Sequence, residues 1–267
     1  MITRIGHHPA MGAAKFVARE LAATVRVAAA APRGWRGRTH TQTNRGTEAG
    51  RAAAPDLVVL VHGFMATAAA FAPLVDYLRL TEGLPVRTFS YHPGSTLDGI
   101  SRRIHQAIRS EEGALRVHLV GHSLGGLAVR WYVQEHHHDP RVVQTISIAS
   151  PFFGVELADL FPDALRALAF PRAGAIRRIV RNAPEHLERV PHLSIVADKD
   201  QLIRPTHAGI LPGAPSFLLH DTGHNGTLYH RKLPEIVGKE IRRLARPRRG
   251  TTQSVAPSAL EPRLAVK

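Results

Sequence analysis

The sequence predicts a doubly wound, mostly parallel α/β fold with a small helical cap. Short apolar runs alternate with amphipathic helical segments from residue 57 onward, which is the pattern of βαβ units. One apolar run leads directly into Gly121-His122-Ser123-Leu124-Gly125 and then into a helical segment. The alternation breaks over residues 152–191 and then resumes, which indicates an insertion that covers the sheet.

The first part of the predicted domain begins with a buried parallel strand. Residues 57–61 are all Leu or Val and stop abruptly at His62-Gly63, as expected for a strand covered on both faces. Thr67 is predicted to cap a helix whose apolar positions are Phe71, Leu74, Val75 and Leu78. The elements expected next are a strand at 86–91, a helix at 97–109, a strand at 117–120, a helix at 124–134 and a strand at 142–148.

The second part contains the cap and the end of the sheet. Residues 152–191 carry helical pieces separated by Pro162, Pro171 and Pro184. Strands at 193–196 and 216–219 and a helix at 233–244 follow. We therefore expect three regions: a basic N-terminal helix and linker at 1–54, the α/β domain at 55–246 with its cap, and a basic disordered tail at 247–267.

The composition limits the chemistry and the partners. The chain has 267 residues and no cysteine, so neither a disulfide framework nor a thiolate site is available. The net charge of +14 lies in the ends: residues 1–51 hold nine basic and two acidic residues, residues 239–267 hold eight and two, and the body is nearly neutral. These ends are either solvated or attracted to anionic lipid. Nucleic-acid binding is disfavoured because the basic runs contain almost no aromatic residue for stacking.

The N-terminal region resembles neither a membrane span nor a signal peptide. No stretch approaches 18 uninterrupted apolar residues, and residues 21–31 are interrupted by Arg26. We interpret residues 9–31 as a basic amphipathic helix that lies on a membrane or packs on the domain. A cytoplasmic or peripheral membrane location is therefore favoured.

The motif around Ser123 predicts a nucleophile. A serine between a strand and a helix, with Gly121 and Gly125 on either side, can be held in a sharp, strained turn. The N-terminus of the following helix directs backbone N–H groups towards an oxyanion. We expect the N–H group of Leu124 to be one such donor.

Several motifs together resemble the bacterial lipase and esterase branch of the α/β-hydrolases. They are His62-Gly63-Phe64, the serine motif with Gly126, and a Pro-x-x-Gly turn at Pro151-Phe152-Phe153-Gly154. The resembling group also includes deacylases of glycosylphosphatidylinositol-type lipids. The resemblance covers residues 56–244 and implies that Phe64 gives the second oxyanion N–H.

The same resemblance implies the order serine, acid, histidine along the chain. His224 lies in a loop between glycines, directly after a strand, and is the expected base; His220 and His230 are the alternatives. Asp200 precedes an apolar pair and a proline and is the expected acid. Asp198 is the alternative, and the residue not used would cap the turn or pair with Lys199 in solvent.

We expect no metal and no cofactor. His136, His137 and His138 are adjacent on a helix end and point in different directions, and no phosphate loop is present. The predicted activity is hydrolysis of a small-molecule or lipid ester through an acyl-enzyme. Acyl transfer, thioesterase or amidase activity, or a binding protein without catalysis, are the alternatives. Seven apolar residues of the cap region either line an acyl pocket or form the cap's own core: Phe152, Phe153, Leu157, Leu160, Phe161, Leu165 and Leu168.

Overall fold

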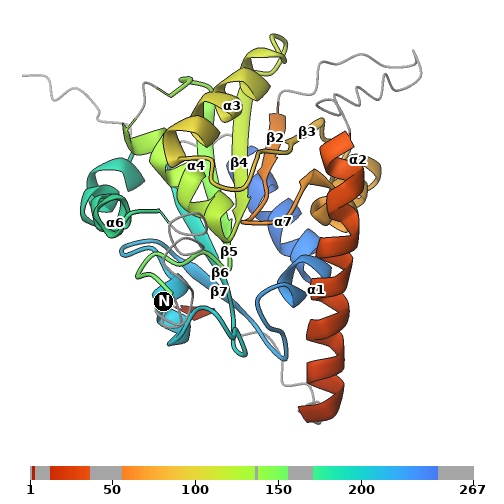
Figure 1. The fold of residues 1–267 in the computed structure, drawn as a ribbon. Helices are drawn as coiled ribbons and strands as arrows, with labels where there is room; N and C mark the ends of the chain where they lie inside the picture. Colours follow the sequence, from red (N-terminus) through yellow and green to blue (C-terminus); the bar gives the residue numbers. More distant parts are fainter. Residues whose placement is uncertain (1, 4–12, 37–55, 136–137, 156–170, 246–267) are drawn as a thin grey trace, which may run out of the picture.

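A parallel β-sheet forms the centre of the molecule (Figure 1). The computed structural model describes residues 2–3, 13–36, 56–135, 138–155 and 171–245. Within them, seven strands follow the order β1-β7-β6-β5-β4-β2-β3, and every neighbouring pair is parallel. The predicted parallel α/β fold is therefore confirmed. The strands are β1 Ile2–Thr3, β2 Asp56–Val61, β3 Val86–Phe89, β4 Arg116–His122, β5 Val142–Ile148, β6 His192–Ala197 and β7 Ser216–Leu219.

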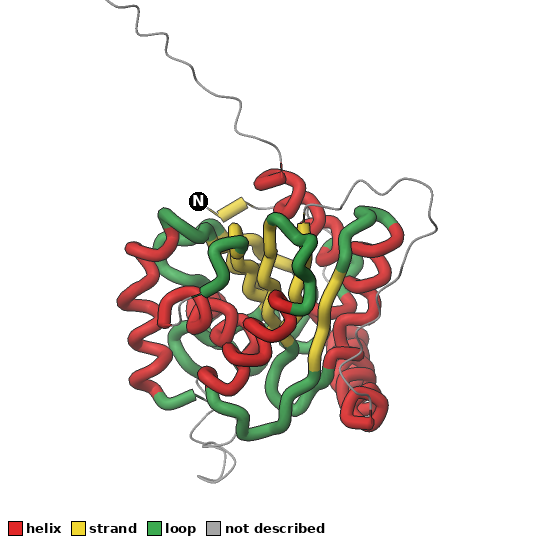
Figure 2. The backbone as a smooth tube through the Cα atoms, turned by 90° about the horizontal axis from the view of Figure 1, so that it is seen from above, coloured by secondary structure: helices red, strands yellow, loops and turns green. Residues whose placement is uncertain are grey.

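Helices cover both faces of the sheet (Figure 2). One core cluster joins apolar residues of α3, α4 and α6 to the sheet, and a second joins α1, α2 and α7 to it. The fold is therefore doubly wound, as predicted. The helices are α1 Ala13–Arg36, α2 Ala72–Leu80, α3 Leu97–Arg109, α4 Leu124–Glu135, α6 Ala173–Leu187 and α7 Leu233–Ala245.

Helix α3 shows how the sequence pattern produces a covering helix. Thr96 precedes it, and its side-chain oxygen accepts the N–H group of Gly99 at 3.1 Å, which satisfies one of the free donors of the first turn. Ile100, Ile104 and Ile108 recur at helical spacing and are fully buried in one core cluster. The capping residue Thr96 and the apolar stripe indicate the same helix, so α3 has the bounds expected from the sequence.

The helix expected after Thr67 is divided in two. Residues Ala68–Phe71 form a 3₁₀ helix, η1, and α2 begins at Ala72 with Pro73 in its first turn. A continuous α-helix would need an N–H group at Pro73, which proline lacks, so the α-helical pattern starts there instead. The side chain of Thr67 makes no capping hydrogen bond, so that part of the prediction is wrong.

Strand β3 ends two residues earlier than predicted. Its last pair joins Phe89 to Val61, the final residue of β2, so no partner strand continues beyond it. The N–H group of Tyr91 donates instead to the Nε2 atom of His62 at 3.2 Å. The segment after β3 is therefore used to hold the loop after β2.

The N-terminal helix is present and packs on the domain. Helix α1 begins four residues later than the predicted segment and ends five residues later. Ala23 and Val27 are buried, and α1 contacts η1 and the 3₁₀ helix η4, Gly226–Tyr229. In Figure 1, α1 runs along the edge of the molecule. The linker, the C-terminal tail and cap residues 156–170 lie outside the described residues.

Candidate active site

Ser123 lies in the sharp turn between β4 and α4. Its φ angle is +52°, in the left-handed region that side chains other than glycine rarely adopt. The N–H group of Ser123 donates to the carbonyl of Ile148 at 2.8 Å, which ties the turn to the neighbouring strand β5. Ser123 remains partly exposed while the residues on either side of it are buried. The backbone therefore holds this hydroxyl at the carboxyl edge of the sheet, where substrates reach α/β proteins.

Three glycines allow this turn to pack tightly. A Cβ atom at Gly121 would collide with the backbone of Gly125, and one at Gly125 would collide with the carbonyl oxygen of Val61. A Cβ atom at Gly126 would meet the hydroxyl of Ser150. The start of α4 therefore lies directly against β2 and the turn after β5, and the position of Ser123 is fixed from both sides.

The structure brings the three predicted triad residues together. The Oγ atom of Ser123 lies 3.1 Å from Nε2 of His224, and Nδ1 of His224 lies 2.9 Å from Oδ2 of Asp200. A carboxylate can only accept, so Nδ1 carries the proton and Nε2 is free to accept one from the serine. The arrangement has the geometry of a base oriented by an acid and aimed at a hydroxyl.

Asp200 is held as a carboxylate by its hydrogen bonds. Its Oδ1 atom accepts the N–H groups of Leu202 at 2.8 Å and Ile203 at 2.9 Å. Burial raises the pKa of Asp200, but the hydrogen bond with His224 and these two N–H groups outweigh it, so the net pKa lies below the usual value. Asp200 is therefore charged at neutral pH although it is buried.

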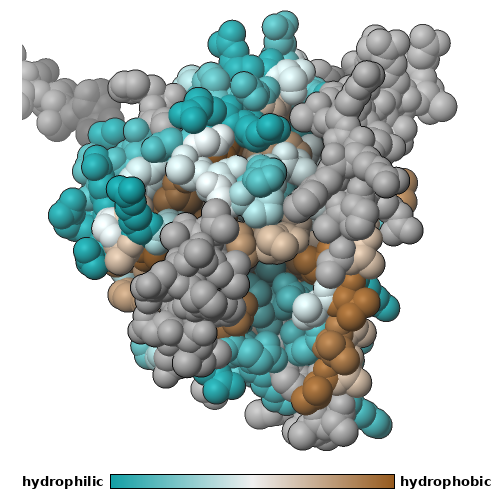
Figure 3. All heavy atoms as spheres, in the orientation of Figure 1, coloured by the Kyte–Doolittle hydropathy of each residue, from teal (hydrophilic) through white to brown (hydrophobic). Residues whose placement is uncertain are grey.

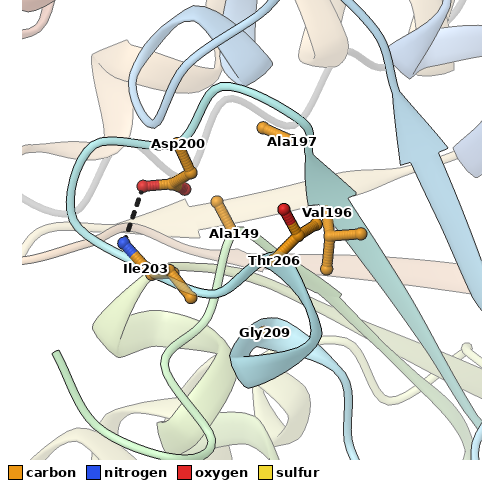
Figure 4. Close-up of a pocket in the computed structure, with 7 residues that line it drawn as sticks. All are labelled: Ala149, Val196, Ala197, Asp200, Ile203, Thr206 and Gly209. Atoms are coloured by element: carbon orange, nitrogen blue, oxygen red, sulfur yellow. Dashed lines mark hydrogen bonds between the residues drawn. The ribbon is translucent and has the colours of Figure 1, made fainter. Parts of the chain in front are cut away.

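A small hollow adjoins Asp200 (Figure 4). Its walls are mainly apolar and come from the ends of β5 and β6 and from the loop after β6. Neither Ser123 nor His224 lines it, so we assign it to the packing around the acid. The lining residues are Ala149, Val196, Ala197, Asp200, Ile203, Thr206 and Gly209.

Asp198, the alternative acid, has a different role. Its Oδ1 atom accepts the N–H group of Thr222 at 3.4 Å, and its Oδ2 atom lies 3.3 Å from Nδ1 of His220. It therefore braces the turn after β7, as expected for the residue not used as the acid. Lys199 pairs with Asp221 at 2.6 Å.

The other histidines considered do not face Ser123. His220 is paired with Asp198, and the Nδ1 atom of His230 accepts the N–H group of Lys232 at 3.2 Å. His136 and His137 lie outside the described residues, and His138 lies 6.5 Å from Tyr132, ring centre to ring centre. Within the described part of the chain, no group of three or more acidic or histidine side chains is placed to hold a metal ion.

The two predicted oxyanion donors lie at this edge of the sheet. Leu124 is the first residue of α4, so its N–H group has no acceptor within the helix. Phe64 follows β2 in a loop anchored through His62: the hydroxyl of Tyr91 donates to the His62 carbonyl at 2.5 Å, and the two rings stack at 4.0 Å. A Cβ atom at Gly63 would lie 3.0 Å from Cβ of Ser123, so this loop passes immediately beside the serine.

One contact at the site was missed by the sequence analysis. The carboxylate of Glu20, in α1, accepts the N–H groups of Gly223 at 2.8 Å and Gly226 at 3.3 Å, on either side of His224. The chain separation is 203 residues in the first case, and no local pattern marks such a pair. The N-terminal helix, predicted to lie outside the domain that carries the site, therefore adjoins it.

Comparison with known proteins agrees with this geometry. The family model described as palmitoyl protein thioesterase matches residues 57–183, which include Phe64 and Ser123 but not Asp200 or His224. No curated protein matches the chain significantly in sequence.

Solved structures match over most of their length. The lipase BlEst2 of Bacillus licheniformis is 16% identical with a TM-score of 0.55, and the match covers 74% of this chain and 95% of that one. A lipase-esterase related protein of Clostridium acetobutylicum is 17% identical, with a TM-score of 0.51 and coverages of 71% and 94%. The lin2722 gene product of Listeria innocua is 18% identical, with a TM-score of 0.52 and coverages of 67% and 91%.

The chain has the α/β-hydrolase fold. This confirms the resemblance seen in the serine motif, and the named matches agree with the predicted enzyme class of lipases and esterases. None of these matches names a deacylase of glycosylphosphatidylinositol-type lipids, so that branch stays a prediction. No described helix of the chain is long and apolar enough to cross a membrane.

Proposed function

We propose that this α/β-hydrolase cleaves carboxylic esters through an acyl-enzyme on Ser123. The observation that carries the proposal is the chain of contacts from Ser123 through His224 to Asp200, with two distances near 3 Å. A serine hydroxyl is a weak nucleophile at neutral pH and needs an adjacent, oriented base. A buried Asp200 with a lowered pKa supplies that orientation.

The reaction proceeds in two halves. As the Oγ atom of Ser123 bonds to the ester carbonyl carbon, its proton passes to Nε2 of His224, and the N–H groups of Phe64 and Leu124 bind the oxyanion. The carbon–oxygen bond to the alcohol then breaks, and His224 returns the proton to the leaving oxygen. In the second half, water attacks the acyl-enzyme, gives a proton to His224 and releases the acid, with Ser123 taking the proton back.

We place a lipid-like or medium-length acyl chain beneath the cap. Of the apolar residues predicted to line a pocket there, Phe152 is fully buried in the main core and Phe153 is exposed. Phe152 thus takes the alternative role as a core residue. The others, Leu157, Leu160, Phe161, Leu165 and Leu168, lie outside the described residues, and the acyl preference rests on their composition.

Thioester hydrolysis is the second candidate, because the matching family model is described as a thioesterase. The same triad serves both reactions, and only the leaving atom differs. Rates on an acyl thioester and on the oxygen ester of the same acid would separate them. We expect the oxygen ester to be the better substrate; a preference for the thioester would assign the second function.

The Ser123→Ala variant tests the proposal. We expect hydrolysis of a series of p-nitrophenyl esters to fall by about 10³-fold or more, since removal of a triad member typically has that effect. Fluorophosphonate labelling should also disappear. The matched control is Ser110→Ala, at an exposed position directly after α3. Unchanged turnover in Ser123→Ala would refute the proposal.

We also propose that the outer side of α1 contacts an anionic membrane. Val17, Leu21 and Val25 are spaced by four residues, so they form one apolar stripe, and their side chains are 61%, 64% and 55% exposed. Figure 3 shows a brown row along this helix. Lys15 and Arg19 are exposed on the same helix, and nine basic residues lie in the first 51. Exposed apolar and basic side chains on one helix suit an anionic lipid surface.

Co-sedimentation with phosphatidylserine vesicles tests this contact. We expect a variant with serine at positions 17, 21 and 25 to bind several-fold more weakly, and binding of the wild type to fall with salt. Leu115→Ser is the control, because Leu115 is equally exposed but lies outside α1. Equal binding by the triple variant, or a change in its oligomeric state instead, would overturn the proposal.

A further inference from the structure

The loop that carries His224 is held from outside the triad by helix α1. Glu20 accepts the N–H group of Gly223 through Oε1 at 2.8 Å and that of Gly226 through Oε2 at 3.3 Å. A second contact joins the same two segments, since the Asn225 amide donates to the Thr24 hydroxyl at 3.1 Å. The carboxylate of Glu20 therefore joins Gly223 to Gly226, with His224 and Asn225 between them in the chain.

The glycines of this loop fit the carboxylate closely. A Cβ atom at Gly223 would lie 2.5 Å from Cδ of Glu20, and one at Gly226 would collide with Oε1. Neither glycine has a positive φ angle, so backbone conformation alone does not require glycine at either position. The lack of a Cβ atom lets Glu20 approach both positions, together with Gln201 at Gly223 and Thr222 at Gly226.

Other groups restrain this loop as well, among them Asp198, which accepts the N–H group of Thr222 at 3.4 Å. The N–H group of His224 donates to Gln201 at 3.4 Å, and its carbonyl accepts the Thr227 hydroxyl at 2.7 Å. Both contacts involve the backbone of His224 itself. Hydrogen bonds to a charged acceptor are about twice as strong as those between neutral groups, so the Glu20 bridge is a strong restraint on the backbone that flanks the base.

We infer that Glu20 is a positioning residue for His224, holding the base in line with Ser123 through the backbone of residues 223–226. The inference rests on the proposed function. It extends the site to Glu20 in the N-terminal helix, 103 residues before Ser123, the first triad member in the chain. Displacement of a catalytic group by about 1 Å can lower a rate by about 10²-fold, so the effect is measurable.

Kinetics of the full chain test the inference. In Glu20→Ala we expect kcat on a short p-nitrophenyl ester to fall by about 10 to 100-fold with an unchanged KM, because Glu20 contacts the backbone of the His224 loop. Glu20→Gln should lie between this variant and the wild type, since the two N–H groups face different oxygens of Glu20 and one of them would then face the amide NH₂ group. Glu112→Ala, which removes the same charge from an exposed turn, is the control.

Amide hydrogen exchange provides a readout that does not depend on activity. We expect exchange at Gly223 and Gly226 to become faster in Glu20→Ala, with exchange in the β4 strand unchanged. Unchanged exchange at the two glycines, or an unchanged kcat in an active protein, would overturn the role of Glu20. An equal loss of kcat in Glu112→Ala would do the same. A wild type that neither hydrolyses esters nor reacts with fluorophosphonate would instead refute the proposed function, and the exchange result would still decide the contact.

Discussion

Replacement of Asp200 by asparagine should remove nearly all activity, for a reason visible in its hydrogen bonds. The Oδ1 atom of Asp200 accepts two backbone N–H groups, from Leu202 and Ile203, while Oδ2 faces Nδ1 of His224. An asparagine must keep its oxygen on the two N–H donors, so its NH₂ group would face His224. The imidazole would then accept at Nδ1 and carry its proton on Nε2, directed at Ser123.

A histidine in that tautomer cannot take the proton of the serine. Loss of the correct tautomer lowers kcat by about 10⁴-fold in serine hydrolases, which corresponds to about 5.5 kcal/mol of transition-state stabilisation. We expect this loss in the initial rate of p-nitrophenyl ester hydrolysis, with KM changed little. The folded state should remain, because asparagine has the shape of aspartate.

Asp198→Asn is the matched control. Asp198 accepts the N–H group of Thr222, and an amide oxygen can do the same. We expect its turnover to stay within about tenfold of wild type. Turnover within tenfold of wild type in Asp200→Asn, or a large loss in Asp198→Asn instead, would refute the assignment of the acid.

Three further predictions concern stability. Burial lowers the pKa of His62 to about 4 and that of His122 to about 3, so between about pH 6.5 and 4 the unfolded chain binds more protons than the folded chain. The free energy of unfolding should therefore fall on acidification by up to about 1.4 kcal/mol per pH unit for each group. Denaturant titrations that show no fall would contradict this. Gly125→Ala should lower the free energy of unfolding by about 1 to 3 kcal/mol, because its methyl group meets the Val61 carbonyl; an unchanged thermal midpoint would show that the turn can relax. Tyr91→Phe removes the donor to the buried His62 carbonyl and should lower the same free energy by about 1 to 3 kcal/mol, which equilibrium unfolding would reveal.

Most of the sheet and its covering helices could be predicted because local pattern and tertiary environment agree there. In strand β2, the side chains of residues 57–61 are apolar on both faces of the sheet, and all of them are fully buried. The split at Pro73 was missed since apolar periodicity dominates the pattern, although the lack of an N–H group at proline is itself visible in the sequence. The early end of β3 depends on where its partner β2 ends, which is a property of the pair and not of either segment alone.

The residues of the site also divide into those marked by a local sequence pattern and one that depends on tertiary packing. Ser123 stands in a local motif, and His224 and Asp200 follow strands in an order shared with the resembling group, so the sequence was sufficient to select them. Glu20 reaches the site only because α1 packs against η4, next to the loop after β7 that carries His224. Its single charge on an otherwise ordinary helix carries no signal until the fold is known.

The contact between Glu20 and the loop after β7 also has a consequence during synthesis. The ribosome completes Glu20 about 200 residues before Gly223, and at roughly 5 to 20 residues per second that interval lasts roughly 10 to 40 s. Strand β1 has the same delay, because Ile2 pairs with Ser216 in β7. Glu20 and β1 therefore meet their partners only after the loop after β7 has been synthesised, and a nascent chain that already displays Ser123 still lacks the restraint on its base.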